Sequence, residues 1–178
     1  MPAALCHRGC MSAEQHRYQV RFDWGIAGAE AVASDADVIV WVDAIGFSDV
    51  PELPGPGAVI TTGFASAHAA AGWVAQLQKD LARRISIAVI AAGASREGAP
   101  RYAVEDQLAA GAVIDGLARL GIDATSPEAA AAEGAYLHLA RAVGHLVTAS
   151  VSATGASYTP ADFRIDETAG VTVNRLQR

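Results

Sequence analysis

Two nearly continuous apolar runs, over residues 38–42 and 85–91, constrain the fold of this chain more than any other feature of its sequence. A strand that is apolar throughout is buried on both faces, as happens in parallel sheets covered by helices. Apolar residues also recur at helical spacing over 66–81 and 104–120, after strand candidates. Strands that alternate with helices of this length predict an α/β fold, namely a mainly parallel sheet with helices on both faces.

The rest of the chain supplies shorter elements and clear interruptions. Ser126, Pro127 and Glu128 combine a serine N-cap, a proline and an acid near the positive end of the helix dipole, which predicts the start of a helix. Residues 51–57 hold three prolines and two glycines, which predicts a loop. We expect further strands over 18–22, 58–62 and 171–173, helices over 27–33 and 127–143, and a loop over 93–100.

Length and charge limit the organisation and the partners of the chain. It has 178 residues, and we expect a disordered tail over 1–16 followed by a single domain over 17–178. The formal net charge of −6 argues against nucleic acid or an anionic membrane as a partner, since both attract basic surfaces. No apolar run approaches the roughly 20 residues of a membrane span, and no signal peptide is evident. We therefore expect a cytoplasmic protein, with its oligomeric state, a homo-oligomer included, left open.

The two cysteines of the chain, Cys6 and Cys10, lie in this expected tail. With His7 and His16 they offer a fragment of a metal site, but structural zinc sites need a second ligand pair elsewhere in the sequence. We therefore interpret this segment as a disordered leader.

Open parallel sheets bind their ligands at the carboxyl ends of the strands, which here are followed by residues 43–49, 61–66 and 93–106. Asp43 leaves a strand that we expect to be buried, where an ionised carboxylate needs a cation or hydrogen-bond donors. It is therefore a candidate metal ligand, although it can equally cap the following turn. Ser48 is either a donor to a phosphate or a plain turn serine.

Arg101, Glu105 and Asp106 form the densest polar cluster of the sequence, at the start of the helix expected over 104–120. A helix N-terminus binds anions, and Arg101 can add two parallel hydrogen bonds to a phosphate or sulfonate. Glu105 and Asp106 are candidate ligands for Mg²⁺, although adjacent helical residues point about 100° apart and so face a ligand unequally. Acids in a first turn can also serve only to complement the helix dipole.

These segments resemble the 2-phosphosulfolactate phosphatase family over about residues 18–155. The most specific part is Arg101-Tyr-Ala-Val-Glu-Asp-Gln-Leu-Ala-Ala-Gly-Ala, which is similar to the Glu-Asp-x-Leu-x-Ala-Gly-Ala helix of the family. Asp43, Phe47 and Ser48 match a family loop that follows an earlier strand. Gly63-Phe-Ala-Ser resembles the family's turn before the next helix.

The resemblance implies a Mg²⁺-dependent phosphatase that hydrolyses the phosphate monoester of 2-phospho-3-sulfolactate, a step of coenzyme M synthesis, or of a related small phosphorylated acid. This phosphorylated or sulfonated acid is then the expected partner. The implied catalytic residues and metal ligands are Asp43, Glu105 and Asp106, and the implied substrate-binding residues are Ser48, Arg101 and Ser66.

The sequence departs from the family pattern at two places. Only residues 49–57 fill the interval where the family has a further strand and helix, and Gly46 stands where arginine or serine is expected. Groups that cradle the phosphate are lost with such a segment. The alternative is therefore a non-catalytic relative that binds a small anion or a protein partner. A nucleotide site comes third, because no glycine-rich nucleotide motif is present.

Overall fold

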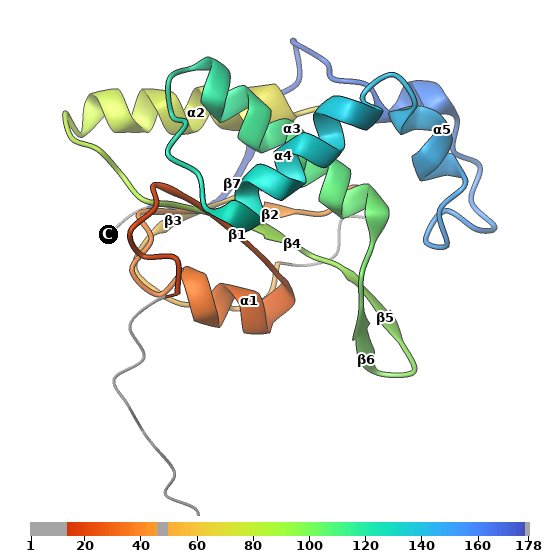
Figure 1. The fold of residues 1–178 in the computed structure, drawn as a ribbon, viewed down its shortest axis with the longest axis horizontal. Helices are drawn as coiled ribbons and strands as arrows, with labels where there is room; N and C mark the ends of the chain where they lie inside the picture. Colours follow the sequence, from red (N-terminus) through yellow and green to blue (C-terminus); the bar gives the residue numbers. More distant parts are fainter. Residues whose placement is uncertain (1–13, 46–49, 177–178) are drawn as a thin grey trace, which may run out of the picture.

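A five-stranded sheet in the order β1-β4-β2-β3-β7 forms the centre of the computed structural model, which describes residues 14–45 and 50–176 (Figure 1). The first four strands in this order run parallel, and β7 pairs antiparallel with β3 at one edge. The predicted α/β class with a mainly parallel sheet is therefore confirmed. The strands are β1 (Val20–Trp24), β2 (Val38–Val42), β3 (Ala58–Thr62), β4 (Ile87–Ala91) and β7 (Thr172–Arg175).

Both apolar runs of the sequence become interior strands of this sheet. Every residue of β2 and of β4 is buried. Along β2, Val38 and Val40 face the larger apolar core, whereas Ile39 and Trp41 face a smaller core on the opposite side. The alternation follows from the two-residue period of a strand, so each run contributes to both cores at once.

Helices cover both faces of the sheet, as predicted. α1 (Gly25–Val32) packs on one face, where its buried residues join the smaller core. The larger core lies on the other face, and much of it is alanine, whose small side chain lets helices approach the sheet closely. The helices on that face include α2 (Ala67–Asp80), α3 (Val104–Arg119) and α4 (Pro127–Leu139) (Figure 1).

The start of α4 has the predicted cap. Ser126 is fully buried, and its Oγ accepts the backbone N–H of Ala129 at 3.1 Å. Pro127 occupies the first position of the helix. A proline there costs no hydrogen bond, since an N–H at that position has no partner within the helix.

The helix predicted over 127–143 is divided in two. α4 ends at Leu139, and a separate short helix, α5 (Val143–Thr148), follows after a turn. The change of direction brings Gly144 against Pro160, the first residue of a short 3₁₀ helix. A Cβ on residue 144 would lie 2.3 Å from the Pro160 carbonyl oxygen, so this close contact requires glycine.

A β-hairpin replaces the loop predicted over 93–100. β5 (Ala94–Arg96) pairs antiparallel with β6 (Ala99–Arg101), and the pair projects from the sheet as a two-stranded ribbon (Figure 1). Glu97 and Gly98 form the turn with positive φ angles, as two-residue hairpin turns require. The segment carries no alternating apolar pattern, so its periodicity did not reveal the strands.

Residues 14–16, which precede the predicted domain boundary at 17, contact the sheet and α1. The Glu14 N–H donates to the Ala31 carbonyl at 2.8 Å. The Gln15 side chain bonds both the N–H and the carbonyl of Phe22. These contacts attach the segment before β1 to α1 and to β1 itself.

The remaining expectations about the N-terminal segment fall outside the described residues. Cys6 and Cys10 lie outside the described residues. Both interpretations of their segment, a disordered leader and a metal site, therefore stay predictions. Among the helices that the structure describes, none has the length and apolar character of a membrane span.

Candidate functional site

The carboxyl ends of β2 and β4 lie side by side, because these strands are parallel neighbours with Val42 opposite Ala91. Asp43 follows β2 directly, and Gly93 follows shortly after β4. The Ala92 N–H extends the pairing by donating to the Val42 carbonyl at 2.8 Å. Two segments that are far apart in the sequence thus meet at one rim of the sheet.

Asp106 joins these two strand ends from the first turn of α3. Its Oδ1 accepts the N–H of Ala44 at 2.8 Å, and its Oδ2 accepts the N–H of Gly93 at 2.9 Å. Gly93 has a φ of 72°, a left-handed conformation that favours glycine. One carboxylate therefore fixes the loops after β2 and β4 relative to the start of α3.

Three carboxyl groups concentrate negative charge at this rim. Asp43, Glu105 and Asp106 are 9%, 2% and 3% exposed. The pKa of Asp106 is raised to about 7, mainly by burial and further by the charges of Asp43 and Glu105. The two backbone hydrogen bonds to its carboxylate act in the opposite direction and lower the pKa. These carboxylates therefore repel one another, and a proton or a cation at the rim would relieve the repulsion.

Glu105 is close to an aromatic pair at the same rim. Its Oε2 is buried and has no hydrogen-bond partner among the described residues. Burial raises the pKa of Tyr102, and the charge of Glu105 raises it further, so the two side chains interact. The Tyr102 ring packs on Trp24 with the ring centroids 5.0 Å apart. A buried carboxylate oxygen without a partner is costly and favours a group that donates to it or coordinates it.

The three acids predicted as metal ligands do not form a complete ligand cage. In the described part of the chain, no group of three or more histidine, cysteine, aspartate or glutamate side chains is arranged to hold a metal ion. Mg²⁺ nevertheless needs only one or two carboxylates when water and substrate supply its other ligands. The Glu105 oxygen without a partner among the described residues and the mutual repulsion of the acids around Asp106 fit a cation bound in this way. Mg²⁺ therefore stays a prediction, with one or two protein ligands.

Ser66 lies at a cavity that adjoins the carboxylates. This rim cavity has a volume of about 290 Å³. The Ser66 Oγ lies 2.9 Å from Oγ1 of Thr62 and does not cap α2, the helix that follows it. Ala44, whose N–H is bound by Asp106, also lines the rim cavity and connects it to the acids.

Arg101 lines a different cavity, on the hairpin side of the rim. This hairpin cavity, of about 240 Å³, is also lined by Trp24 and Tyr102. The Arg101 guanidinium donates to Oγ of Ser152 at 2.8 Å and to the carbonyl of Tyr102 at 2.9 Å. The structure thus separates Arg101 from Ser66, although the sequence predicted both as substrate-binding residues.

Two residues of the rim cavity were missed by reasoning from the sequence, and one prediction falls outside the structure. Tyr158 and Asp162 line the rim cavity from a C-terminal segment that has no periodic apolar pattern. The available signal was the spacing of Thr159 and Asp162, which form a capping box around the 3₁₀ helix. Ser48 lies outside the described residues, so its role stays a prediction.

The fold and the site define a parallel α/β protein with buried carboxylates at the carboxyl ends of its strands. No protein-family model matches the sequence, and no curated protein matches it. The resemblance to 2-phosphosulfolactate phosphatases therefore rests on the sequence segments alone.

Proposed function

We propose that this protein is a Mg²⁺-dependent phosphatase for a small phosphorylated acid, of the kind hydrolysed by the 2-phosphosulfolactate phosphatases that its sequence resembles. The observation that carries the proposal is the contact of Asp106 with the ends of two parallel strands, beside Asp43 and Glu105. Parallel α/β proteins bind their ligands at this rim, and carboxylates gathered there suit a hard cation.

The rim cavity suits the phosphate of such a substrate. It is lined by Ser66, whose hydroxyl can donate to a phosphate oxygen, and it adjoins the acids through Ala44. Ser66 immediately precedes α2, whose first turn contains no acid, and a helix start of this kind favours an anion. The first turn of α3 instead holds Glu105 and Asp106, which repel an anion unless a cation lies between them.

One or two of Asp43, Glu105 and Asp106 would hold the cation, since the charges of Asp43 and Glu105 act on Asp106 and the Glu105 Oε2 has no hydrogen-bond partner among the described residues. Bound Mg²⁺ would neutralise phosphate oxygens and orient the phosphoryl group for in-line attack by water. Ser66 positions the phosphate in this proposal. The burial of Asp43 and Asp106 strengthens their attraction for a cation, because less water screens their charges.

Phosphate release tests the proposal directly. Purified protein is incubated with 2-phospho-3-sulfolactate, and separately with simple phosphate monoesters, in Mg²⁺ or in EDTA. We expect turnover only with Mg²⁺, and a loss of at least about tenfold in Asp43→Asn. The control variant Glu30→Gln removes a negative charge from the exposed side of α1 and is expected to keep full turnover. A folded protein without turnover, or turnover that persists in EDTA, contradicts the proposal.

A non-catalytic role in anion binding is the second candidate, and two observations favour it. Both carboxylate oxygens of Asp106 already accept backbone N–H groups. The Arg101 guanidinium already donates to Ser152 and to the Tyr102 carbonyl. These side chains thus have structural roles that need no substrate. Calorimetric binding of inorganic phosphate by a protein that releases none from esters supports this candidate.

A further inference from the structure

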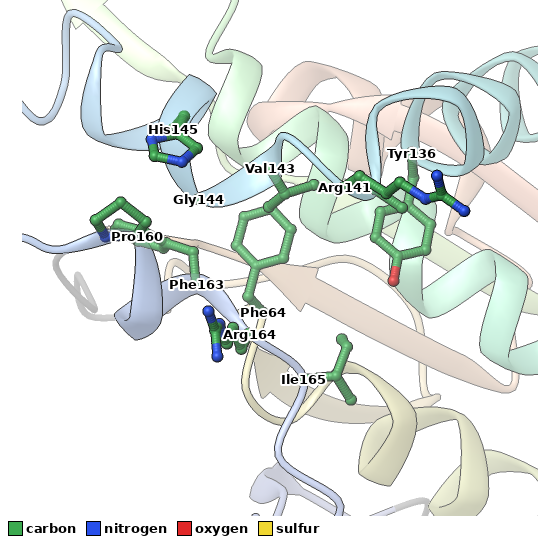
Figure 2. Close-up of a pocket in the computed structure, with 11 residues that line it drawn as sticks. Phe64, Tyr136, Arg141, Val143, Gly144, His145, Pro160, Phe163, Arg164 and Ile165 are labelled. Carbon is green, nitrogen blue, oxygen red and sulfur yellow. The ribbon is translucent and has the colours of Figure 1, made fainter.

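A third cavity, which we call the arginine cavity, lies where α4, α5 and the 3₁₀ helix Pro160–Phe163 meet (Figure 2). It has a volume of about 250 Å³. Phe64 and Phe163 line both this cavity and the rim cavity, so the two cavities share an aromatic wall. The two rings form an edge-to-face pair with centroids 6.0 Å apart. A concave surface that combines an aromatic wall with a few polar groups is typical of a small-molecule site.

Positive groups surround this apolar wall. Arg141, Arg164 and His145 line the arginine cavity, and its lining includes no aspartate or glutamate. Neither Arg141 nor Arg164 makes a hydrogen bond or an ion pair with any residue that the structure describes. A guanidinium is always charged, so the cavity holds a local excess of positive charge in a chain whose formal net charge is −6.

The two arginines come from different segments, since Arg141 follows α4 and Arg164 follows the 3₁₀ helix, and their guanidinium groups do not meet in the view of Figure 2. One molecule with an acid group at each end can therefore pair with both guanidinium groups. Tyr136 also lines the arginine cavity. Burial raises the pKa of Tyr136, and the charge of Asp115 adds to the effect, so its hydroxyl keeps its proton and can donate to an anion.

We propose that the arginine cavity binds a small organic diacid, with its apolar body against Phe64 and Phe163 and one carboxylate paired with each of Arg141 and Arg164. A guanidinium binds a carboxylate through two parallel N–H···O bonds, and the aromatic wall accepts the hydrocarbon part. The volume lies below the roughly 300–1,000 Å³ of sites for drug-sized ligands, so the ligand is a single ring or a short chain. This site does not depend on the proposed phosphatase activity.

The shape of the arginine cavity depends on one close backbone contact. Gly144 and Pro160 both line it, and a Cβ on residue 144 would meet the Pro160 carbonyl oxygen at 2.3 Å. Phe163 is held in turn by Tyr158, with the ring centroids 5.4 Å apart. A larger residue at position 144 would therefore displace the 3₁₀ helix that carries Phe163.

Calorimetric titration with phenylsuccinate, which carries two carboxylates and one ring, tests the proposal. We expect saturable binding, and binding of 3-phenylpropionate, which has one carboxylate, at least about tenfold weaker. Arg141→Gln and Arg164→Gln should each weaken phenylsuccinate about tenfold and remove its advantage over 3-phenylpropionate, because each variant leaves one carboxylate without a partner. Arg96→Gln removes the same charge from the exposed hairpin tip and should leave both affinities unchanged.

Several results would overturn the proposal. These are no saturable binding by the folded protein up to about 10 mM phenylsuccinate, equal affinity for the two acids, or an equal loss in Arg96→Gln. Displacement of phenylsuccinate by inorganic phosphate at equal concentration would contradict the role of the aromatic wall, because phosphate has no hydrocarbon part to bind there. Both arginines are exposed, so we expect their variants to unfold at the temperature of the unmodified protein. Asp106→Asn should retain phenylsuccinate binding, which distinguishes this site from the phosphatase site.

Discussion

The Asp106 carboxylate accepts the N–H of Ala44 at 2.8 Å and thereby ties the first turn of α3 to the loop after β2. The same position buries the carboxylate, and burial is the main reason that its pKa rises to about 7. The hydrogen bonds of Asp106 stabilise the rim, whereas its ionisation there costs free energy. Its effect on stability therefore depends on pH.

The raised pKa of Asp106 predicts that its contribution to stability is lost as pH rises from about 4 to about 7. In the unfolded chain this carboxyl has its ordinary pKa of 3.8, so between these values the folded state binds the proton more tightly. The contribution is complete below the unfolded pKa and disappears as pH passes the folded pKa. We expect the free energy of unfolding, measured by urea denaturation, to fall by up to a few kcal/mol over this interval.

Asp106→Asn isolates that contribution, because asparagine does not ionise. In this variant we expect the free energy of unfolding to lose the decrease between about pH 4 and pH 7 that Asp106 causes. Asparagine has one acceptor oxygen for the two N–H groups of Ala44 and Gly93, so the variant also loses about 1–3 kcal/mol at low pH. Asp80→Asn, at an exposed position, should keep the original slope. An unchanged slope in Asp106→Asn would contradict the raised pKa.

Asp37 has the opposite effect on stability in acid. The Arg83 side chain, together with Ser86, lowers the pKa of Asp37 to about 2. A lowered carboxyl pKa contributes stability that is present above the unfolded pKa and is lost as pH falls from about 4 to about 2. We expect Arg83→Gln to move the acid unfolding midpoint, followed by circular dichroism, to higher pH. The control Arg96→Gln should not move it, and an equal shift in both variants would contradict the pairing.

The crossing of α3 and α4 predicts opposite effects for two glycines. A Cβ on Gly111 would lie 2.3 Å from the Ala132 carbonyl oxygen and 2.6 Å from Cβ of Tyr136, whereas a Cβ on Gly134 would meet nothing within 4 Å. Gly111→Ala should therefore force the helices apart and cost roughly 1–3 kcal/mol. Gly134→Ala, at an exposed position in α4, should stabilise by roughly 0.5–1 kcal/mol. Thermal unfolding of both variants measures the difference, and effects of the same sign would contradict this packing.

The cap of α4 predicts a loss of stability when Ser126 is replaced. Its Oγ accepts the Ala129 N–H, so Ser126→Ala should cost about 1 kcal/mol in urea denaturation. Ser66→Ala is the matched control, because Ser66 occupies the corresponding position of α2 without capping it. The control should lose clearly less stability, and equal losses would show that the cap contributes little.

The interior strands were the most predictable part of the fold. The strand predicted over 58–62 has the observed bounds, because a run that must be buried on both faces ends where polar or turn residues begin. The strand predicted over 85–91 begins two residues later, at Ile87. The first strand was predicted over 18–22 but spans Val20–Trp24. A period of two fixes which residues share a face, but it does not fix where pairing with a neighbour begins.

The candidate site was predictable in its location and not in its contacts. The strand-end rule directed attention to the segments that hold Asp43 and Asp106. It could not reveal that the Asp106 oxygens accept the N–H groups of Ala44 and Gly93, since such contacts depend on how loops from separate parts of the chain pack. For the same reason, the pairing of Arg101 with Ser152, which is remote in the sequence, had no local signal.

The order of the sheet has a consequence for biosynthesis. β4 lies between β1 and β2, although it follows both along the chain. A nascent chain that has not yet reached Ile87 therefore has two parallel strands that cannot pair with each other in their final positions. β4 is synthesised only after β1, β2, β3 and α2, and pairing at such sequence separation is slow. Until then the apolar edges of the early strands remain open to chaperones or to aggregation.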